Sequence, residues 1–162
     1  MKDNTKPKDT HIQTSSQSSL YLTCSHDSLF YIFWIRIEKK KINHDFLIAA
    51  KYGDLETCTE LLSKKRGELK AEVDYKEEND WCPLHFACLN GNTALVELLI
   101  RNEANIEAET NLLKFTPLII ASQKGHRDIA SLLMQAGADI NGVDMYNNTP
   151  LHYASQSGML ST

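Results

Sequence analysis

One ten-residue pattern occurs three times in this chain at a nearly fixed distance. The copies are CPLHFACLNG at 82–91, TPLIIASQKG at 116–125 and TPLHYASQSG at 149–158. Their prolines, Pro83, Pro117 and Pro150, are 34 and 33 residues apart. Self-similarity at such a period predicts a stack of repeated structural units, each too small to bury its apolar face alone.

A fourth, weaker copy lies upstream when the units are aligned on their last glycine. These glycines are Gly53, Gly91, Gly125 and Gly158, at separations of 38, 34 and 33 residues. The extra residues of the first unit fall around 64–67, and one more lies in the loop before the third unit. Insertions confined to connections are what a stacked architecture tolerates. The predicted units are about 44–79, 80–113, 114–146 and 147–162.

Each unit has the signals of two short helices. Thr116 and Thr149 stand before a proline, so a hydroxyl caps a helix whose first position needs no N–H. The glycine eight residues later predicts a stop in left-handed conformation. A second apolar helix follows at 95–100 and at 129–134, with a stripe wide enough to require burial between units. The polar segment 141–148 then favours a hairpin turn.

This pattern resembles the ankyrin repeat, whose signature is T-P-L-H-x-A with a period of 33 residues. Residues 149–154 match it fully, whereas Cys82 replaces the threonine in one unit and Ile119 the histidine in another. Residues 45–53 lack the signature and resemble the atypical N-terminal cap of such arrays. The resemblance covers about residues 44–162. It implies an all-α fold, an α-solenoid of helix pairs with short β-hairpin fingers and a concave face that binds proteins.

Two positions depart from the family pattern. Glu103 stands where Gly137 stands in the next unit, which costs about 1 kcal/mol if the backbone there is left-handed. The fourth unit ends at Thr162 with almost nothing of its second helix. We therefore expect a fragment or truncated array, in which residues 150–162 fray for want of a covering helix.

The N-terminal quarter of the chain differs from the repeats. Residues 1–28 are polar and lack an apolar period, which predicts disorder. Residues 29–43 form an apolar and then basic segment of uncertain structure. Three interpretations stay open: a helix or strand that packs on the first unit, a membrane-surface or partner contact aided by Lys39–Lys41, or no well-formed element.

Charge and composition exclude several classes of protein. Residues 1–43 carry a net charge of +3 and residues 44–162 one of −7, and acidic repeats repel a phosphate backbone. The chain contains no apolar span of about 20 residues and no secretory signal, so the membrane is an improbable partner. Its four cysteines form no C-x-x-C pair or zinc-ligand spacing, which favours a reducing, cytoplasmic location, with the nucleus as the alternative.

No residue pattern indicates catalysis or a cofactor. Phosphate-binding glycine loops, H-E-x-x-H and G-x-S-x-G are all missing from the sequence. The resemblance implies that His85 and His152 are structural and bridge the backbones of adjacent units. Cys58 and Cys88 occupy core positions, and Cys82 substitutes for a capping threonine. We therefore expect no enzyme, no cofactor and no metal, and the sequence gives no evidence for a homo-oligomer.

The expected function is binding of a protein partner of unknown identity by the fingers and the exposed ends of the first helices. Trp81, Phe115 and Tyr146 are the preferred anchors, although packing between fingers explains the first two equally well. The candidate protein-binding residues are Glu78, Asn79, Trp81, Leu89, Asn90, Leu112, Leu113, Phe115, Gln123, Lys124, Met145, Tyr146, Asn148, Gln156 and Ser157. Two alternatives are a targeting region of a larger kinase, acyltransferase, channel or ubiquitin-ligase adaptor, and, more weakly, a membrane-associated scaffold.

Overall fold

The computed structural model describes residues 28–63 and 69–158, apart from the side chains of Ser28 and Glu78. Within these ranges the chain is helical and contains no β-strand. The elements are α1 (Ser28–Tyr52), α2 (Leu55–Ser63), a 3₁₀ turn η1 (Glu78–Asp80), α3 (Pro83–Asn90), α4 (Thr93–Arg101), α5 (Pro117–Lys124), α6 (Arg127–Gln135) and α7 (Pro150–Gln156). Disorder was expected at 1–28, and of these, residues 1–27 lie outside the described residues. The insertion at 64–67 lies outside them too.

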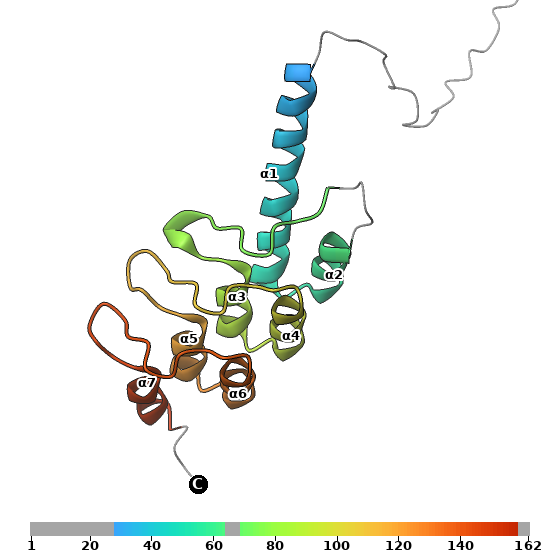
Figure 1. The fold of residues 1–162 in the computed structure, drawn as a ribbon. Coiled ribbons are helices and arrows are strands. Elements are labelled where there is room, and N and C mark those ends of the chain that lie inside the picture. Colours follow the sequence, from blue (N-terminus) through green and yellow to red (C-terminus); the bar gives the residue numbers. More distant parts are fainter. Residues whose placement is uncertain (1–27, 64–68, 159–162) are drawn as a thin grey trace, which may run out of the picture.

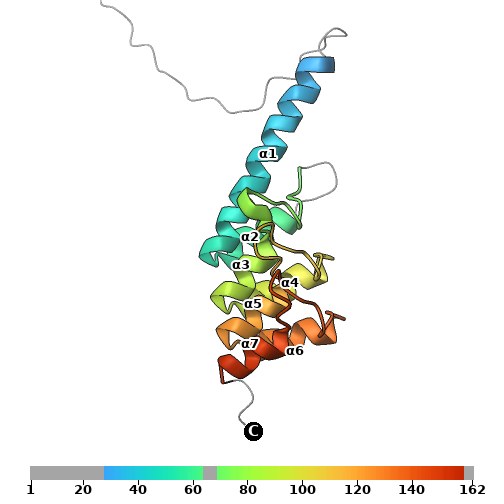
Figure 2. The same cartoon turned by 90° about the vertical axis from the view of Figure 1, so that its left-hand side faces the viewer.

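The helices form two rows. Helices α1, α3, α5 and α7 follow one another in the first row, and α2, α4 and α6 lie beside them in the second (Figure 1). Seen from the side in Figure 2, each pair lies below the preceding one. This order follows the four units of the sequence and confirms the all-helical class.

The helix ends obey the signals of the sequence. Thr116 accepts a hydrogen bond from Ile119 N at 3.3 Å, and Pro117 follows as the first helical residue. Gly91 and Gly125 end α3 and α5 with φ of 71° and 76°, in the left-handed region where a Cβ is costly. Glu103 adopts the same region with φ 62°, so the expected unfavourable helix end is present.

The core lies between the rows and contains the predicted apolar stripes. Leu95, Val96 and Leu99 of α4 are fully buried, and Ile129 and Leu133 of α6 are nearly so. Burial of a Leu or Ile side chain is worth about 1.5 to 3 kcal/mol, so the stripes supply most of the stabilisation between units. The α4 stripe packs between α2 and α6, so neighbouring units depend on one another for burial.

The loops between units differ from the predicted β-hairpin fingers. Each is a turn closed by only a pair of backbone hydrogen bonds; in the second loop, for example, Thr110 N donates to Phe115 O at 3.1 Å and Lys114 N donates to Thr110 O at 3.0 Å. Too few bonds form for a strand ladder, because side chains make the remaining contacts. Asp144 Oδ1, for example, accepts from the backbone N of both Tyr146 and Asn148.

Successive loops are nevertheless joined side by side. Asn111 N donates to Asn79 O at 2.9 Å, and Met145 N donates to Leu113 O at 3.1 Å. Closer to the helices, a carboxylate of each loop binds the next loop: Asp74 accepts from Asn105 N, and Glu107 from Asp139 N, both at 2.8 Å. The loops therefore form one continuous row along the stack.

Helix α1 is the largest difference from the expected domain organisation. It continues without a break from the apolar segment 29–43 into the first unit. Its buried face begins at Asn43 and includes Phe46, Leu47 and Ala50. The first two turns of α1 project beyond the stack (Figures 1 and 2). In these turns Leu29 to Trp34 are each more than half exposed. These side chains do not pack on the first unit.

Candidate interaction groove

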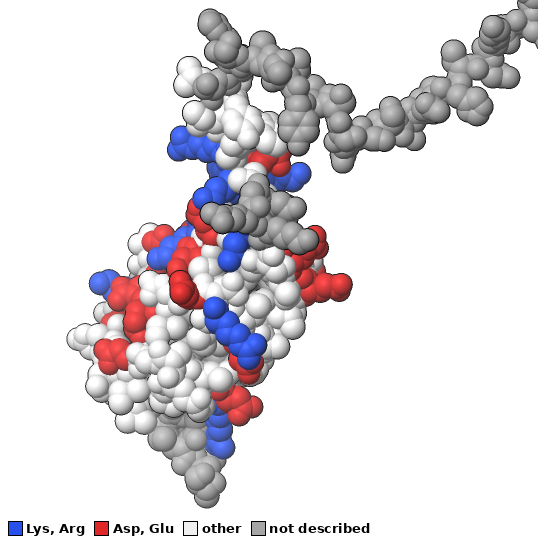
Figure 3. All heavy atoms as spheres, turned by 45° about the vertical axis from the view of Figure 1, so that its right-hand side comes forward, with Lys and Arg blue, Asp and Glu red and all other residues white. Residues whose placement is uncertain are grey.

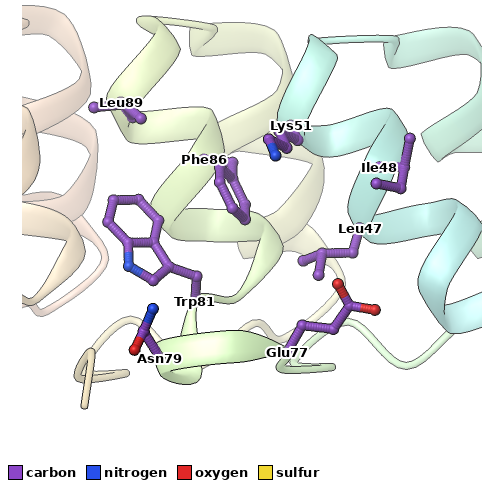
Figure 4. A pocket seen from close by; sticks show the side chains of 8 residues that line it. All are labelled: Leu47, Ile48, Lys51, Glu77, Asn79, Trp81, Phe86 and Leu89. Carbon is purple, nitrogen blue, oxygen red and sulfur yellow. The ribbon is translucent and has the colours of Figure 1, made fainter. Parts of the chain in front are cut away.

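A hollow of about 360 Å³ lies where α1, α3 and the first loop meet. Leu47, Ile48 and Lys51 of α1 line one side, Phe86 and Leu89 of α3 the other. Figure 4 shows the Phe86 ring between the α1 side chains and the Trp81 indole, with Glu77 and Asn79 on the loop below. The hollow is open to solvent and its wall is mainly apolar.

A second hollow of about 200 Å³ adjoins the first along the stack. Asn79, Trp81 and Leu89 line both, so these three side chains form the wall between them. Leu112, Leu113 and the other residues of the second hollow continue the surface toward α5; they include Phe115, Ile120, Gln123 and Lys124. We call the two hollows together the groove.

Trp81 is positioned by the residues around it. Its indole packs on Phe86 with ring centroids 5.0 Å apart and on His85 at 5.7 Å, and its side chain is half-buried. Lys51 Nζ stands 6.0 Å from the centroid of the Phe86 ring, within reach of a cation–π interaction. Trp81 therefore packs against its own unit and also lines the groove.

The polar groups at the groove are of both signs. Glu77 contacts His44 Nδ1 of α1, while Lys51 and Lys124 are exposed at the helix ends. An apolar floor with separate positive and negative groups at its edge is the usual composition of a protein-binding surface.

The histidine of the pattern is structural in the second unit. His85 Nδ1 accepts from Cys82 N at 3.1 Å, and Nε2 lies 2.9 Å from Ala108 O in the next loop. This bridge between units matches what the family resemblance implied. Burial lowers the pKa of His85 more than its backbone hydrogen bonds raise it, so the ring is neutral near pH 7.

The cysteines of the repeats are buried as predicted. Cys58, Cys82 and Cys88 are inaccessible to solvent, and burial raises the pKa of Cys58 to about 12. Burial also raises the pKa values of Cys82 and Cys88. A thiol that holds its proton is a poor nucleophile. Within 28–63 and 69–158, moreover, no three His, Cys, Asp or Glu side chains gather as metal ligands would.

Most of the predicted binding residues lie together. Eight line the groove: Asn79, Trp81, Leu89, Leu112, Leu113, Phe115, Gln123 and Lys124. Asn90 instead donates to Lys51 O at 2.8 Å and ties α3 to α1. Phe115 packs edge-on against Tyr153 at 5.8 Å, which supports its packing role. The side chain of Glu78 lies outside the described residues.

The predicted residues of the last unit lie apart from the groove. Met145 and Tyr146 are exposed at the tip of their loop, and Gln156 and Ser157 at the end of α7. The donors of Asn148 are already used within the loop, since its N and Nδ2 both donate to Asp144. Tyr153 Oη also donates to Asp144 at 2.6 Å. Burial raises the pKa of Asp144, but its hydrogen bonds from Tyr153, Asn148 and Tyr146 outweigh this and lower it overall.

The groove also contains residues that the sequence reasoning missed, namely Leu47, Ile48, Lys51, Glu77 and Phe86. A signal for some of them existed. Lys51 precedes Gly53 by two residues, as Leu89 precedes Gly91, and Ile48 aligns with Phe86 in the same way. The first unit lacks the signature, yet its first helix presents the same positions.

A family profile described as ankyrin repeats, three copies, matches residues 46–144 and 108–162. Palmitoyltransferase AKR1 of Kluyveromyces lactis is 34% identical over 116 residues, 72% of this chain and 15% of that protein. Ankyrin repeat and SOCS box protein 3 of Homo sapiens is 30% identical over 110 residues, 64% of this chain and 20% of that protein. The chain thus spans a fifth or less of these relatives. Since the profile covers most of its length, the chain belongs to the ankyrin-repeat family.

Proposed function

We propose that this chain is a non-catalytic protein-binding module whose helix pairs form a solenoid and whose groove receives a partner. The observation that carries the proposal is the groove itself. Two adjoining hollows share the side chains of Trp81 and Leu89, Phe86 lines the first of them, and lysine and glutamate side chains border them. Half-buried aromatic residues in such a position are the usual anchors of an interface.

The rigid row of loops favours affinity. Trp81 is held by two ring contacts and its neighbour Asn79 by the bond to Asn111 N. A partner therefore meets side chains that lose little conformational freedom on binding, which lowers the entropic cost of the complex. The same module suits the reducing cytoplasm or nucleus, where its buried thiols remain unpaired.

Affinity capture from the source cells, followed by titration of the captured protein, tests the proposal. Leu112→Ser and Lys124→Glu alter exposed groove residues and are expected to weaken binding while the melting temperature is unchanged. Tyr146→Ala is the matched control, because this exposed aromatic residue lies outside the groove. Equal binding by the wild type and both groove variants would contradict the assignment.

A second candidate is a targeting region of a larger multidomain protein. The observation that favours it is coverage, since this chain matches 15% of a palmitoyltransferase and 20% of a SOCS box protein. In that case the groove has the same role, and it brings the partner to activity located elsewhere. Sequencing the transcript beyond the codon for Thr162 separates the two candidates, because a following catalytic domain favours the second, whereas further repeats alone favour the first.

A further inference from the structure

The first two turns of α1 are unlike the rest of the molecule. Residues 29–35, which we call the tip, are seven consecutive apolar side chains. At about 100° per residue, seven consecutive positions cover every direction around the helix. Leu29 and Phe30 are 81% and 76% exposed, and the next four residues are between 56% and 63% exposed. The tip is thus apolar all round, and six of its seven side chains are more than half exposed, whereas Ile35 is half-buried.

A ring of basic residues follows the tip. Arg36, Lys39, Lys40 and Lys41, which we call the collar, occupy about 200° of the helix circumference at the standard rotation per residue. Lys39 also forms an ion pair with Glu72 at 2.5 Å, so α1 is braced against the first loop at this level. Figure 3 shows blue side chains just below the white end of the helix, with an acidic side chain, drawn red, among them.

The shape of the apolar surface limits what can cover it. A helix that docks in a protein groove buries one stripe, whereas a helix apolar on all sides requires a medium that surrounds it. A second copy packed in parallel would bring two collars together, and their like charges would repel each other. An anionic lipid surface avoids both objections.

The dimensions also fit a lipid interface. From Leu29 to Ile35 the helix rises about 9 Å, close to the depth of about 5 to 10 Å that interfacial helices reach. Trp34 lies at the end of the tip that adjoins the collar, the level at which aromatic belts occur, and Tyr31 lies about one turn farther along the tip. Within the described ranges no helix is long and apolar enough to cross a bilayer.

We propose that the tip inserts into the interface of a membrane rich in anionic lipids and that the collar contacts their headgroups. Projection of α1 keeps the repeats, with their net charge of −7, away from the anionic surface. The groove lies near the base of α1, about residues 47–51, and remains open to a partner. This proposal does not depend on the partner of the groove.

Vesicle flotation of the full chain tests the proposal, with phosphatidylcholine vesicles with and without phosphatidylserine. The wild type is expected to float with the anionic vesicles and to detach as salt is raised. Ile32→Glu with Phe33→Glu, or Lys40→Glu with Lys41→Glu, should each reduce binding at least about tenfold. Lys114→Glu with Lys124→Glu is the matched control, because it makes the same change of net charge far from the collar.

Fluorescence of Trp34 gives a second readout that does not depend on the stability of the tip variants. Trp34 and Trp81 are the two tryptophans of the sequence, so Trp81→Phe leaves Trp34 as reporter. Its emission should shift to the blue on anionic vesicles and be quenched by brominated acyl chains. Failure of the wild type to float, unchanged Trp34 emission, or loss of a dimer as the sole effect of the tip variant would each overturn the proposal.

Discussion

The second and fourth units carry nearly the same ten residues in different surroundings. In the second unit Leu84 and His85 are inaccessible to solvent. In the fourth unit the equivalent Leu151 is 62% exposed, and His152 is exposed too. The backbone contacts within the pattern are nevertheless alike: Nδ1 of each histidine accepts from the N of the residue three positions earlier, at 3.1 and 3.0 Å.

This comparison separates what the pattern does from what its neighbours do. The residues of one unit suffice to cap and end a short helix. Burial of that helix comes from the adjacent helices and the following loop, as the bond from His85 to Ala108 shows. Beside Leu151 there is instead a hollow of about 410 Å³, lined also by Met134 and Ile140. The same motif therefore stabilises the fold to very different extents.

The largest expected difference is between the two leucines. Leu84→Ala removes a fully buried side chain and should lower the free energy of unfolding by about 2 to 5 kcal/mol. Leu151→Ala should cost about 0.5 kcal/mol or less, because its side chain already meets solvent. Urea denaturation followed by circular dichroism measures both. Similar losses in the two variants would show that the hollow beside Leu151 is filled in solution.

Replacement of the histidines sharpens the comparison further. His85→Ala leaves Cys82 N and Ala108 O buried without their partner, at a cost of about 2 to 3 kcal/mol. His152→Ala frees groups that water can reach, so we expect a loss below about 1 kcal/mol. The same denaturation assay compares them. A double variant of His85→Ala with Leu84→Ala would show whether the two losses are coupled.

The contrast also shows what the sequence could predict. Helix starts and stops follow from Thr116, Pro117 and the glycines, because those signals are local. The groove was predicted in part, since the signature aligned Trp81 and Phe115 but gave no reason to include Lys51 of the unit without a signature. The loops were predicted as strands, yet Asp144 bonds the turn with its side chain in place of a ladder.

The continuation of α1 through the apolar segment was not predictable from periodicity. Residues 29–35 are apolar without alternation, a pattern that suits a strand, a buried helix or an interface. The first buried position of α1 is Asn43, whose Oδ1 accepts from Glu72 N at 2.8 Å. That contact joins α1 to a residue 29 positions away, which no local pattern specifies.

The pH dependence of stability tests the protonation of the buried His85. Because burial lowers the pKa of His85, the unfolded chain binds its proton more readily than the folded chain. The contribution of His85 is complete above the unfolded pKa of about 6.5 and is lost as the pH falls below it, by up to about 1.4 kcal/mol per pH unit. The free energy of unfolding of the wild type should therefore fall more steeply from pH 7.5 to pH 5 than that of His85→Gln. Urea denaturation at each pH measures both. Parallel curves would contradict the assignment.

The smallest effect concerns the residue before the proline. Cys82 Sγ lies 3.1 Å from His85 Nδ1, whereas Thr149 Oγ1 lies 2.8 Å from His152 Nδ1. A hydroxyl is the stronger partner, so Cys82→Thr should raise the free energy of unfolding by about 0.5 to 1 kcal/mol. Thr149→Cys should lower it by less, since α7 is exposed and contributes little to the core. If Cys82→Thr is destabilising, the buried thiol is held by packing that a hydroxyl and methyl cannot reproduce, and the second unit differs from the fourth in shape as well as in burial.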